Sequence, residues 1–466
     1  MINQQSFIED IWNQSIIPTL MDYIRIPNKS PLFDANWQKN GYMDQAINLI
    51  ANWCHSHSLP GMKIDIVRLE GRTPILFIDI PGQSDETILL YGHLDKQPEM
   101  SGWRTGLSPW QPVLQEQKLY GRGGADDGYS TFASLLAIKA LQARQVPHAR
   151  CIILIESCEE SGSYDLPFYI DALGTQIGSP SLIICLDSGC ANYDQLWVTT
   201  SLRGVITGTL DINVLTAGIH SGQGSGVVPS CMMILRQLLN RIENESSGKI
   251  LLEELFVDIP SDRLQQAQQM ADALKQEVYA SYPFQKNVRA LTEDTFEQIL
   301  NRTWRPALSI TGCDGLPSTD NAGNVTIPSL KIKLSIRIPP TLNPMHAADS
   351  LKKTLESDPP FNAKIIFNAN VQSPGWNAPT SISWLTDALN QASNQYFGQN
   401  AMYMGEGGSI PFMGMLGEKF PQAQFVITGV LGPESNAHGP NEFLHIPTAK
   451  KLTCCIADII ASHYQN

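Results

Sequence analysis

At 466 residues the chain is too long for one compact core, and we expect two or three domains. Its formal net charge of −13, without any basic stripe, excludes nucleic acid as an expected partner. The sequence has no apolar run long enough for a membrane span and no signal-peptide pattern at its start. The nine cysteines are scattered, several within apolar runs, which favours free thiols and a cytoplasmic location.

The first part of the chain alternates strand-like and helix-like segments. The predicted elements are helices over residues 5–25 (interrupted at Pro18) and 44–58, strands over 64–69, 75–80 and 88–91, a helix over 129–144, a strand over 152–155, a helix over 166–177 and a strand over 182–186. This alternation predicts an α/β sheet with helices on both faces. In such sheets, ligands bind at the carboxyl ends of the strands.

The pattern changes after residue 204. The run from 205 to 374 predicts strand–helix–strand–strand–helix–strand, which is typical of a ferredoxin-like α+β unit. The α/β pattern returns from about Gly375. The sequence therefore predicts an α/β domain with a mixed sheet, formed by residues 1–204 and 375–466 and interrupted by an inserted α+β lid over 205–374.

Polar motifs follow apolar, strand-like runs at five places. These runs are TILLYGHLD, KLYGRGGADD, CIILIESCEE, LIICLDSG and a later SNAHGPNE, and the residues of interest are His93, Asp95, Asp126, Glu159, Glu160, Asp187 and His438. Imidazoles and carboxylates at neighbouring strand ends predict one pocket for hard or borderline metal ions. Each motif alone is also explained by a strand-end histidine, a helix cap or exposed loop acids. Their conjunction favours a metallohydrolase.

The spacing within the motifs suggests separate tasks for neighbouring residues. His93 and Asp95 are two apart at a strand end, so one face carries both, and the carboxylate can support an imidazole ligand. The adjacent Glu159 and Glu160 should diverge. One could then bind metal while the other accepts a proton from a metal-activated water.

The ordered set of motifs resembles the M20 family of dinuclear zinc peptidases and deacylases over nearly the whole chain. The runs YGHLDKQPE, LYGRGGADD, ESCEESGS and GEGGSIP are most similar to its cytosolic dipeptidase and carnosinase branch. The resemblance implies that Asp126 bridges two metals, with His93 and Asp187 on one and Glu160 and His438 on the other. It also implies Glu159 as general base and Asp95 as supporting carboxylate. Two histidines and three carboxylates favour Zn²⁺, with Mn²⁺ or Co²⁺ as alternatives.

The resemblance extends to the lid and to a late loop. His220 in AGIHSGQGSG resembles the lid histidine that reaches the partner subunit's active site and stabilises the oxyanion, which implies a homodimer formed through the lid. Arg337 in KLSIRIPP resembles the arginine that binds the substrate's terminal carboxylate. The residues that resemble the substrate-pocket loop are Glu406, Gly407, Gly408 and Ser409. A loop histidine, a sheet-surface arginine and a plain turn are the alternative interpretations.

The implied reaction is hydrolysis of the amide bond of a dipeptide, or of a similar small substrate with a free carboxylate, by a metal-bound hydroxide. Hydrolysis of N-acyl amino acids at the same centre is the alternative, and an inert binding protein is disfavoured because every matched position is filled. The family usually reads Asp-Asp-Lys-Gly where this chain has Gly128-Tyr129 after Asp127. This departure preserves the predicted ligands but alters the entry to the following helix and the pocket rim.

Overall fold

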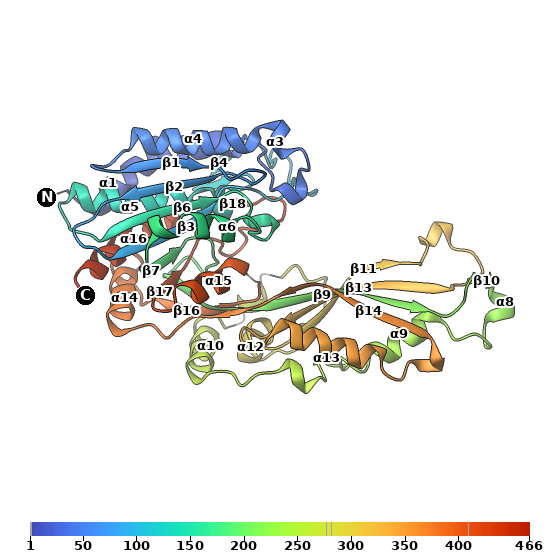
Figure 1. Cartoon of the computed structure of the whole chain (residues 1–466). Helices are drawn as coiled ribbons and strands as arrows, with labels where there is room; N and C mark the ends of the chain where they lie inside the picture. Colours follow the sequence, from blue (N-terminus) through green and yellow to red (C-terminus); the bar gives the residue numbers. More distant parts are fainter. Residues whose placement is uncertain (1, 276, 281, 409) are drawn as a thin grey trace. The chain divides into compact units, whose positions relative to one another are not determined.

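The computed structural model describes residues 2–275, 277–280, 282–408 and 410–466 (Figure 1). The chain forms two compact units. Unit 1 comprises Met1–Thr200, Ala378–Met404 and Met415–Asn466, and unit 2 comprises Ser201–Asn377 and Gly405–Gly414. Unit 2 thus includes residues 201–204, 375–377 and Gly405–Gly414, which the sequence pattern places in the discontinuous domain. Arg203 bonds the last of these segments through its backbone and side chain. The catalytic and lid roles of the units stay predictions.

Unit 1 is built on a mixed sheet, as predicted. Its strand order is β1 (Lys63–Val67), β2 (Ile75–Ile80), β6 (Arg150–Glu156), β3 (Thr87–His93), β7 (Pro180–Cys185), β17 (Gln424–Ile427), β8 (Trp197–Leu202) and β15 (Trp376–Asn377), with β16 (Met402–Glu406) also on β8. The four strands β6, β3, β7 and β17 run parallel, whereas β2 is antiparallel to both of its neighbours, β1 and β6. Strand β3 is buried along its whole length, which explains its continuous apolar sequence.

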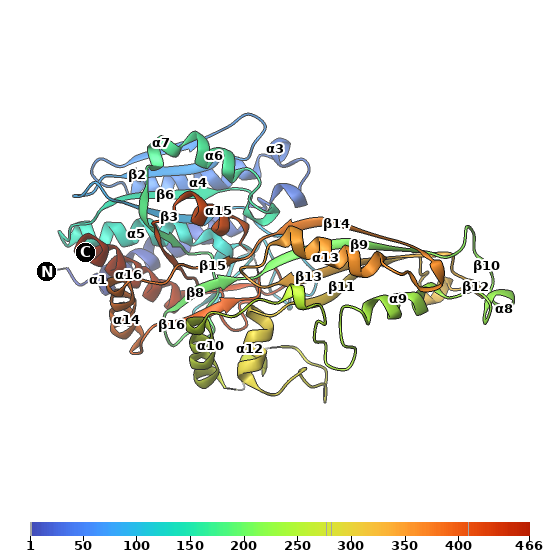
Figure 2. The ribbon, with the colours of Figure 1, turned by 60° about the horizontal axis from the view of Figure 1, so that its bottom comes forward.

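Helices cover the apolar sheet of unit 1. They are α1 (Gln4–Ile11), α2 (Ile17–Ile24), α3 (Trp37–Asn40), α4 (Tyr42–Ser56), α5 (Ser130–Ala143), α6 (Leu166–Ala172), α7 (Gly174–Ile177), α14 (Ser383–Phe397) and α16 (Ile446–Tyr464), while α15 (Pro411–Lys419) spans the boundary with unit 2. Figure 2 shows α1, α14 and α16 side by side. Alternate strand residues such as Leu76 and Ile78 join one apolar cluster with these helices. Among the described residues, no helix is both long and apolar enough to cross a bilayer.

The parallel strands bring their carboxyl ends to one edge of the sheet. His93 at the end of β3 pairs in register with Glu156 at the end of β6, and Tyr91 pairs with Cys185 at the end of β7. A short antiparallel sheet of β4 (Val113–Gln115), β5 (Lys118–Tyr120) and β18 (Phe443–His445) joins the segment before Asp126 to the segment after His438. The strand-end motifs therefore converge from distant parts of the chain.

Unit 2 contains the predicted ferredoxin-like arrangement. The antiparallel order β11 (Ala307–Asp314), β13 (Ser329–Ile338), β9 (Gly204–Asn213) and β14 (Lys364–Ser373) places the first and third strands at the centre. Burial alternates along β9 and β13, so one face packs on α9 (Cys231–Leu239) and α13 (Pro344–Glu356), which lie on the same side of the sheet in Figure 1. The remaining elements are β10 (Ile219–His220), α8 (Ser221–Gly224), α10 (Ser261–Leu274), α11 (Glu277–Ala280), α12 (Thr295–Thr303) and β12 (Val325–Thr326).

Candidate metal centre

Asp95 links the end of β3 to the turn that carries the paired glutamates. Its two carboxylate oxygens accept the backbone N–H groups of Glu159 and Glu160, both at 3.0 Å. Its Oδ1 also lies 3.5 Å from Nδ1 of His93, and both side chains are fully buried. The sequence spacing predicted the contact between Asp95 and His93. The contacts of Asp95 with the backbone of Glu159 and Glu160 were not predicted, because nothing local in the sequence indicates which backbone amides a carboxylate will bind.

Asp126 lies between two imidazoles. Its Oδ1 is 3.3 Å from Nε2 of His93, and its Oδ2 is 3.0 Å from Nε2 of His438. Burial by itself would raise the pKa of Asp126, but the interactions with both histidines outweigh burial and hold the pKa well below its ordinary value. One carboxylate thus offers an oxygen to each side of the site.

The predicted metal-binding residues gather into two groups within unit 1. Potential ligand atoms of each group lie within 4.8 Å of one another, and the groups are His93, Glu159 and Asp187, and Asp126, Glu160 and His438. Within them, Asp187 Oδ2 lies 3.7 Å from His93 Nε2, and Glu160 Oε2 lies 3.2 Å from His438 Nε2. Glu159, predicted as the base, thus lies within ligand distance of the first group.

The electrostatics of the centre favour divalent cations. Burial raises the pKa of Glu159, and the negative charge of Asp187 raises it further. Burial and Asp126 likewise raise the pKa of Glu160. Asp127 is buried with one carboxylate oxygen that has no partner among the described residues. The clustered carboxylates and the two imidazoles together offer oxygen and nitrogen ligands. This donor set suits two divalent ions such as Zn²⁺ or Mn²⁺.

Gln97 is a site residue that the sequence analysis missed. Its Nε2 donates to Oε2 of Glu160 at 2.5 Å, on the oxygen that also faces His438. The donor fixes the orientation of a candidate ligand from outside the ligand set. Its only sequence signal is its place in the run HLDKQP, two residues after Asp95.

Unit 2 carries the predicted lid histidine and carboxylate-binding arginine. His220 ends β10 with an exposed side chain, and its Nδ1 accepts the backbone N–H of Gly222 at 3.0 Å. Arg337 lies on β13, and burial lowers the pKa of its guanidinium. Neither residue belongs to the two candidate metal groups. Their predicted roles in the reaction stay predictions.

Arg203 connects the predicted pocket loop to the rest of unit 2. Its Nε donates to the carbonyl of Gly407 at 3.2 Å, and its backbone N–H donates to the carbonyl of Glu406 at 3.3 Å. Burial, followed by the positive charges of Arg337 and Arg302, lowers the pKa of Arg203 to about 10. The loop and Arg337 therefore share a positively charged neighbourhood that the sequence did not indicate. Gly408 is exposed, and Ser409 lies outside the described residues.

Comparisons with known proteins identify the family. The model of peptidase family M20/M25/M40 matches residues 89–462. Cysteinylglycine-S-conjugate dipeptidase of Corynebacterium striatum is 26% identical over 427 residues, covering 86% of this chain and 88% of that protein. The structure of the di-peptidase Dug1p of Saccharomyces cerevisiae superposes with a TM-score of 0.79 at 21% identity, covering 99% of this chain and 98% of the other.

A second solved structure shows the same fold. Human carnosine dipeptidase 1 superposes with a TM-score of 0.79 at 20% identity, and the whole of each chain is covered. The family model spans every residue of the two candidate metal groups. The chain therefore belongs to peptidase family M20/M25/M40.

Proposed function

We propose that this protein is a metal-dependent dipeptidase that hydrolyses the amide bond of dipeptides or similar small substrates with a free carboxylate. The observation that carries the proposal is Asp126, held between His93 and His438 where it can serve two ions at once. The names of similar proteins, which include Cys-Gly and Beta-Ala-His dipeptidases, support the substrate class.

The proposed cofactors are two divalent ions, with Zn²⁺ preferred and Mn²⁺ or Co²⁺ as alternatives. His93 and Asp187 would hold one ion, Glu160 and His438 the other, and Asp126 both. Bound ions of this kind acidify a water molecule and polarise the scissile carbonyl. The donor set supports this assignment, because imidazole with carboxylate suits these borderline metals.

The proton transfers are assigned to Glu159. The carboxylate would accept a proton from the attacking water and deliver it to the departing amine. Two observations support the role. Asp95 fixes the backbone of the Glu159–Glu160 turn, and Glu159 lies in the group of His93 and Asp187, beside one of the proposed ions.

Recognition of the substrate is assigned to unit 2. Arg337 would pair with the substrate's terminal carboxylate, and the loop of Glu406, Gly407, Gly408 and Ser409 would line the pocket. The positive charges near Arg203 support an anionic ligand here. His220 would stabilise the oxyanion of a partner subunit's substrate.

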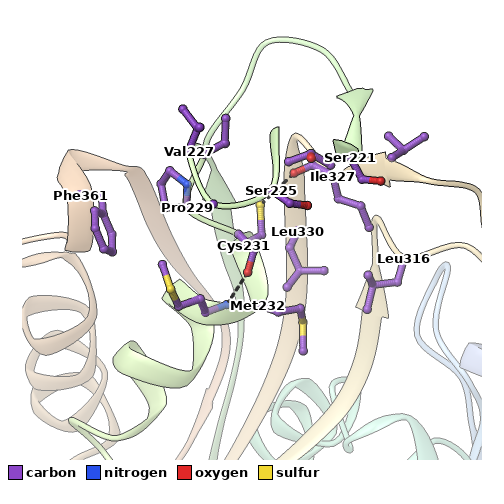
Figure 3. A pocket seen from close by; sticks show the side chains of 16 residues that line it. Ser221, Ser225, Val227, Pro229, Cys231, Met232, Leu316, Ile327, Leu330 and Phe361 are labelled. Carbon is purple, nitrogen blue, oxygen red and sulfur yellow. Dashed lines mark hydrogen bonds between the residues drawn. The ribbon is translucent and has the colours of Figure 1, made fainter. Parts of the chain in front are cut away.

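A homodimer formed through the lid is part of the proposal. Beside His220, a cavity of about 610 Å³ opens between α8, α9 and β12 in unit 2 (Figure 3). Its lining includes Val227 and Phe361, whose side chains are 82% and 65% exposed. Exposed apolar surface of this kind is typical of protein contacts, and a second copy of the lid is the partner we assign. Sedimentation of a fully active monomer would contradict this assignment.

The substrate class is tested with a mixed panel of compounds. We expect the Zn²⁺- or Mn²⁺-loaded protein to cleave dipeptides with free termini, and chelation to abolish cleavage. The C-terminal amide of each active dipeptide should be a poorer substrate, because it offers Arg337 no carboxylate. Losing one charge-assisted hydrogen bond costs about 1.5–3 kcal/mol, or roughly 10- to 150-fold in kcat/KM. Cleavage of N-acetyl amino acids alone would instead assign the protein to the deacylases.

Metal binding is expected to release protons and to strengthen as pH rises. In the metal-free protein, burial lowers the pKa of His438, but the hydrogen bonds with Asp126 and Glu160 outweigh burial and raise the pKa to about 11. His438 is thus protonated at neutral pH, whereas a metal requires the neutral ring. Affinity should rise roughly tenfold per pH unit for each proton released. Calorimetric titration in buffers of different ionisation enthalpy measures the released protons.

The same group contributes to the pH dependence of the stability of the metal-free fold. Because the folded pKa of His438 exceeds its unfolded value, its contribution to stability is complete below about pH 6.5 and is lost as pH rises towards the folded pKa. The side chain is 55% exposed, so solvent reduces this contribution. His438→Ala is the control for the metal titration described above. Equal proton release on metal binding by this variant and the wild type would contradict the assignment of His438 as a protonated ligand.

We also propose a cytoplasmic location. All nine cysteines are free, and eight of them are buried. Buried free thiols are typical of proteins kept in a reducing compartment.

A further inference from the structure

Arg122 is a buried cation in the segment before Asp126, and it contacts two other segments that carry site residues. Its side chain is 1% exposed and lies against Glu442, which is fully buried, with Nη1 to Oε2 at 2.6 Å. Its Nη2 donates to the carbonyl of Gly439 at 2.7 Å, and its Nε donates to the carbonyl of Pro98 at 3.2 Å. Gly439 directly follows His438, so the guanidinium holds the backbone beside a candidate ligand.

Glu442 completes the connection to the loop of Asp126. Its Oε1 accepts the backbone N–H of Gly123 at 2.9 Å, and its backbone carbonyl accepts the N–H of Gly121 at 3.0 Å. The segment around His438 needs outside support, because His438 has a φ of 63°, which non-glycine residues seldom adopt. A buried ion pair adds little stability over an apolar pair of the same shape. Arg122 and Glu442 instead fix the backbone beside His438 relative to the loop that carries Asp126.

Tyr129 makes a separate contact on the other side of the centre. Its buried hydroxyl donates to the carbonyl of Leu186 at 2.5 Å, and Leu186 directly precedes Asp187. Tyr129 thereby joins the end of β7 to the start of α5. The preceding Gly128 leaves no space for a side chain, since a Cβ there would lie 2.3 Å from the ring of Tyr23. Gly128 and Tyr129, which stand where the family usually has Lys-Gly, therefore both have packing roles in this chain.

We propose that Arg122 and Tyr129 are positioning residues that separately orient the two candidate metal groups. Arg122, through Glu442 and the carbonyl of Gly439, orients His438, a ligand of the second group that the other ion does not share. Tyr129 orients the group of His93, Glu159 and Asp187 through the backbone of Asp187. The inference rests on the two-metal centre proposed above. It adds that the two ions depend on different residues outside the ligand set and can be weakened independently.

The test is titration of the metal-free protein with Co²⁺, which counts bound ions and gives both dissociation constants. The wild type should bind two ions. Arg122→Lys keeps a cation beside Glu442 but loses the planar fork, and Tyr129→Phe loses only a hydroxyl. Each should weaken one ion by about 10- to 100-fold, the usual effect of removing a partner of a metal ligand. Glu442→Gln is a second variant for the Arg122 contact.

A variant background assigns each effect to a site. In His438→Ala, which removes a ligand of one group, Tyr129→Phe should still weaken the remaining ion, whereas Arg122→Lys should have no further effect. Arg150→Lys is the matched control: Arg150 forms a bidentate ion pair with Asp79 on neighbouring strands, and the variant should bind both ions normally. Circular dichroism and thermal unfolding of the metal-free variants monitor the fold.

Three results would overturn the inference. They are unchanged affinities in both variants, equal weakening of both ions by either variant, and a further loss when Arg122→Lys is added to His438→Ala. A wild type that binds fewer than two ions would overturn the proposed metal centre itself, and the inference with it. The wild-type stoichiometry therefore distinguishes the two failures.

Discussion

Replacing Glu159 by glutamine is expected to lower kcat for dipeptide hydrolysis by about 10²- to 10⁴-fold, the contribution usual for a general base. The amide keeps the shape of the side chain but cannot accept the proton of the attacking water. The Asp95 contacts to the backbone of the turn do not involve the Glu159 side chain, so the Glu160 carboxylate should stay in place. Single-turnover kinetics measure the loss, and metal analysis of the same sample measures the ions.

This experiment also separates a base from a ligand. Glu159 lies within ligand distance of His93 and Asp187, so a variant that loses one ion would identify it as a ligand instead. Full activity with both ions retained would exclude both roles. Glu86→Gln is the matched control, because it makes the same chemical change at the opposite end of β3, just before Thr87. We expect this variant to keep normal activity.

Replacing Asp126 by asparagine is expected to weaken both ions and to abolish turnover. Each oxygen of Asp126 faces one imidazole, so one substitution removes a negative charge from both groups. The loss should exceed the roughly 10- to 100-fold that a partner outside the ligand set contributes. Calorimetry of the metal-free variant measures both affinities. The pKa of His438 should also fall, since Asp126 contributes to raising it.

Asp127→Asn is the control for that substitution. Asp127 is adjacent and also buried, but its Oδ2 accepts the backbone N–H of His93 at 3.1 Å, and within the described residues it forms no ion pair with an imidazole. Burial and the charge of Asp187 raise its pKa, and the amide oxygen of asparagine can still accept the backbone N–H of His93. We expect this variant to bind two ions. Retention of both ions by Asp126→Asn would contradict the shared-ligand role.

The sequence determined the elements and the family. Continuous apolar runs predicted the buried strands β3, β6 and β7 close to their observed bounds, because a strand buried on both faces must be apolar throughout. The changed pattern after residue 204 predicted the strands β9 and β13 of the inserted unit, and their alternating burial shows that only one face of that sheet is buried. Pro18 was expected to interrupt the first helix, and the chain there has a π-helical turn at Trp12–Ile16 followed by α2. Such local patterns follow from the burial of each segment.

Contacts between distant segments were decided only by the tertiary structure. Arg122 and Glu442 are separated by 320 positions, and no periodicity links them. The contacts of Asp95 with the turn of Glu159 and Glu160, and of Arg203 with Gly407, likewise join segments that are far apart in the sequence. The sequence specifies which side chains reach the sheet edge, because strand ends and turns are local. Which oxygen faces which imidazole depends on how several loops pack together, and that packing is fixed only in the folded chain.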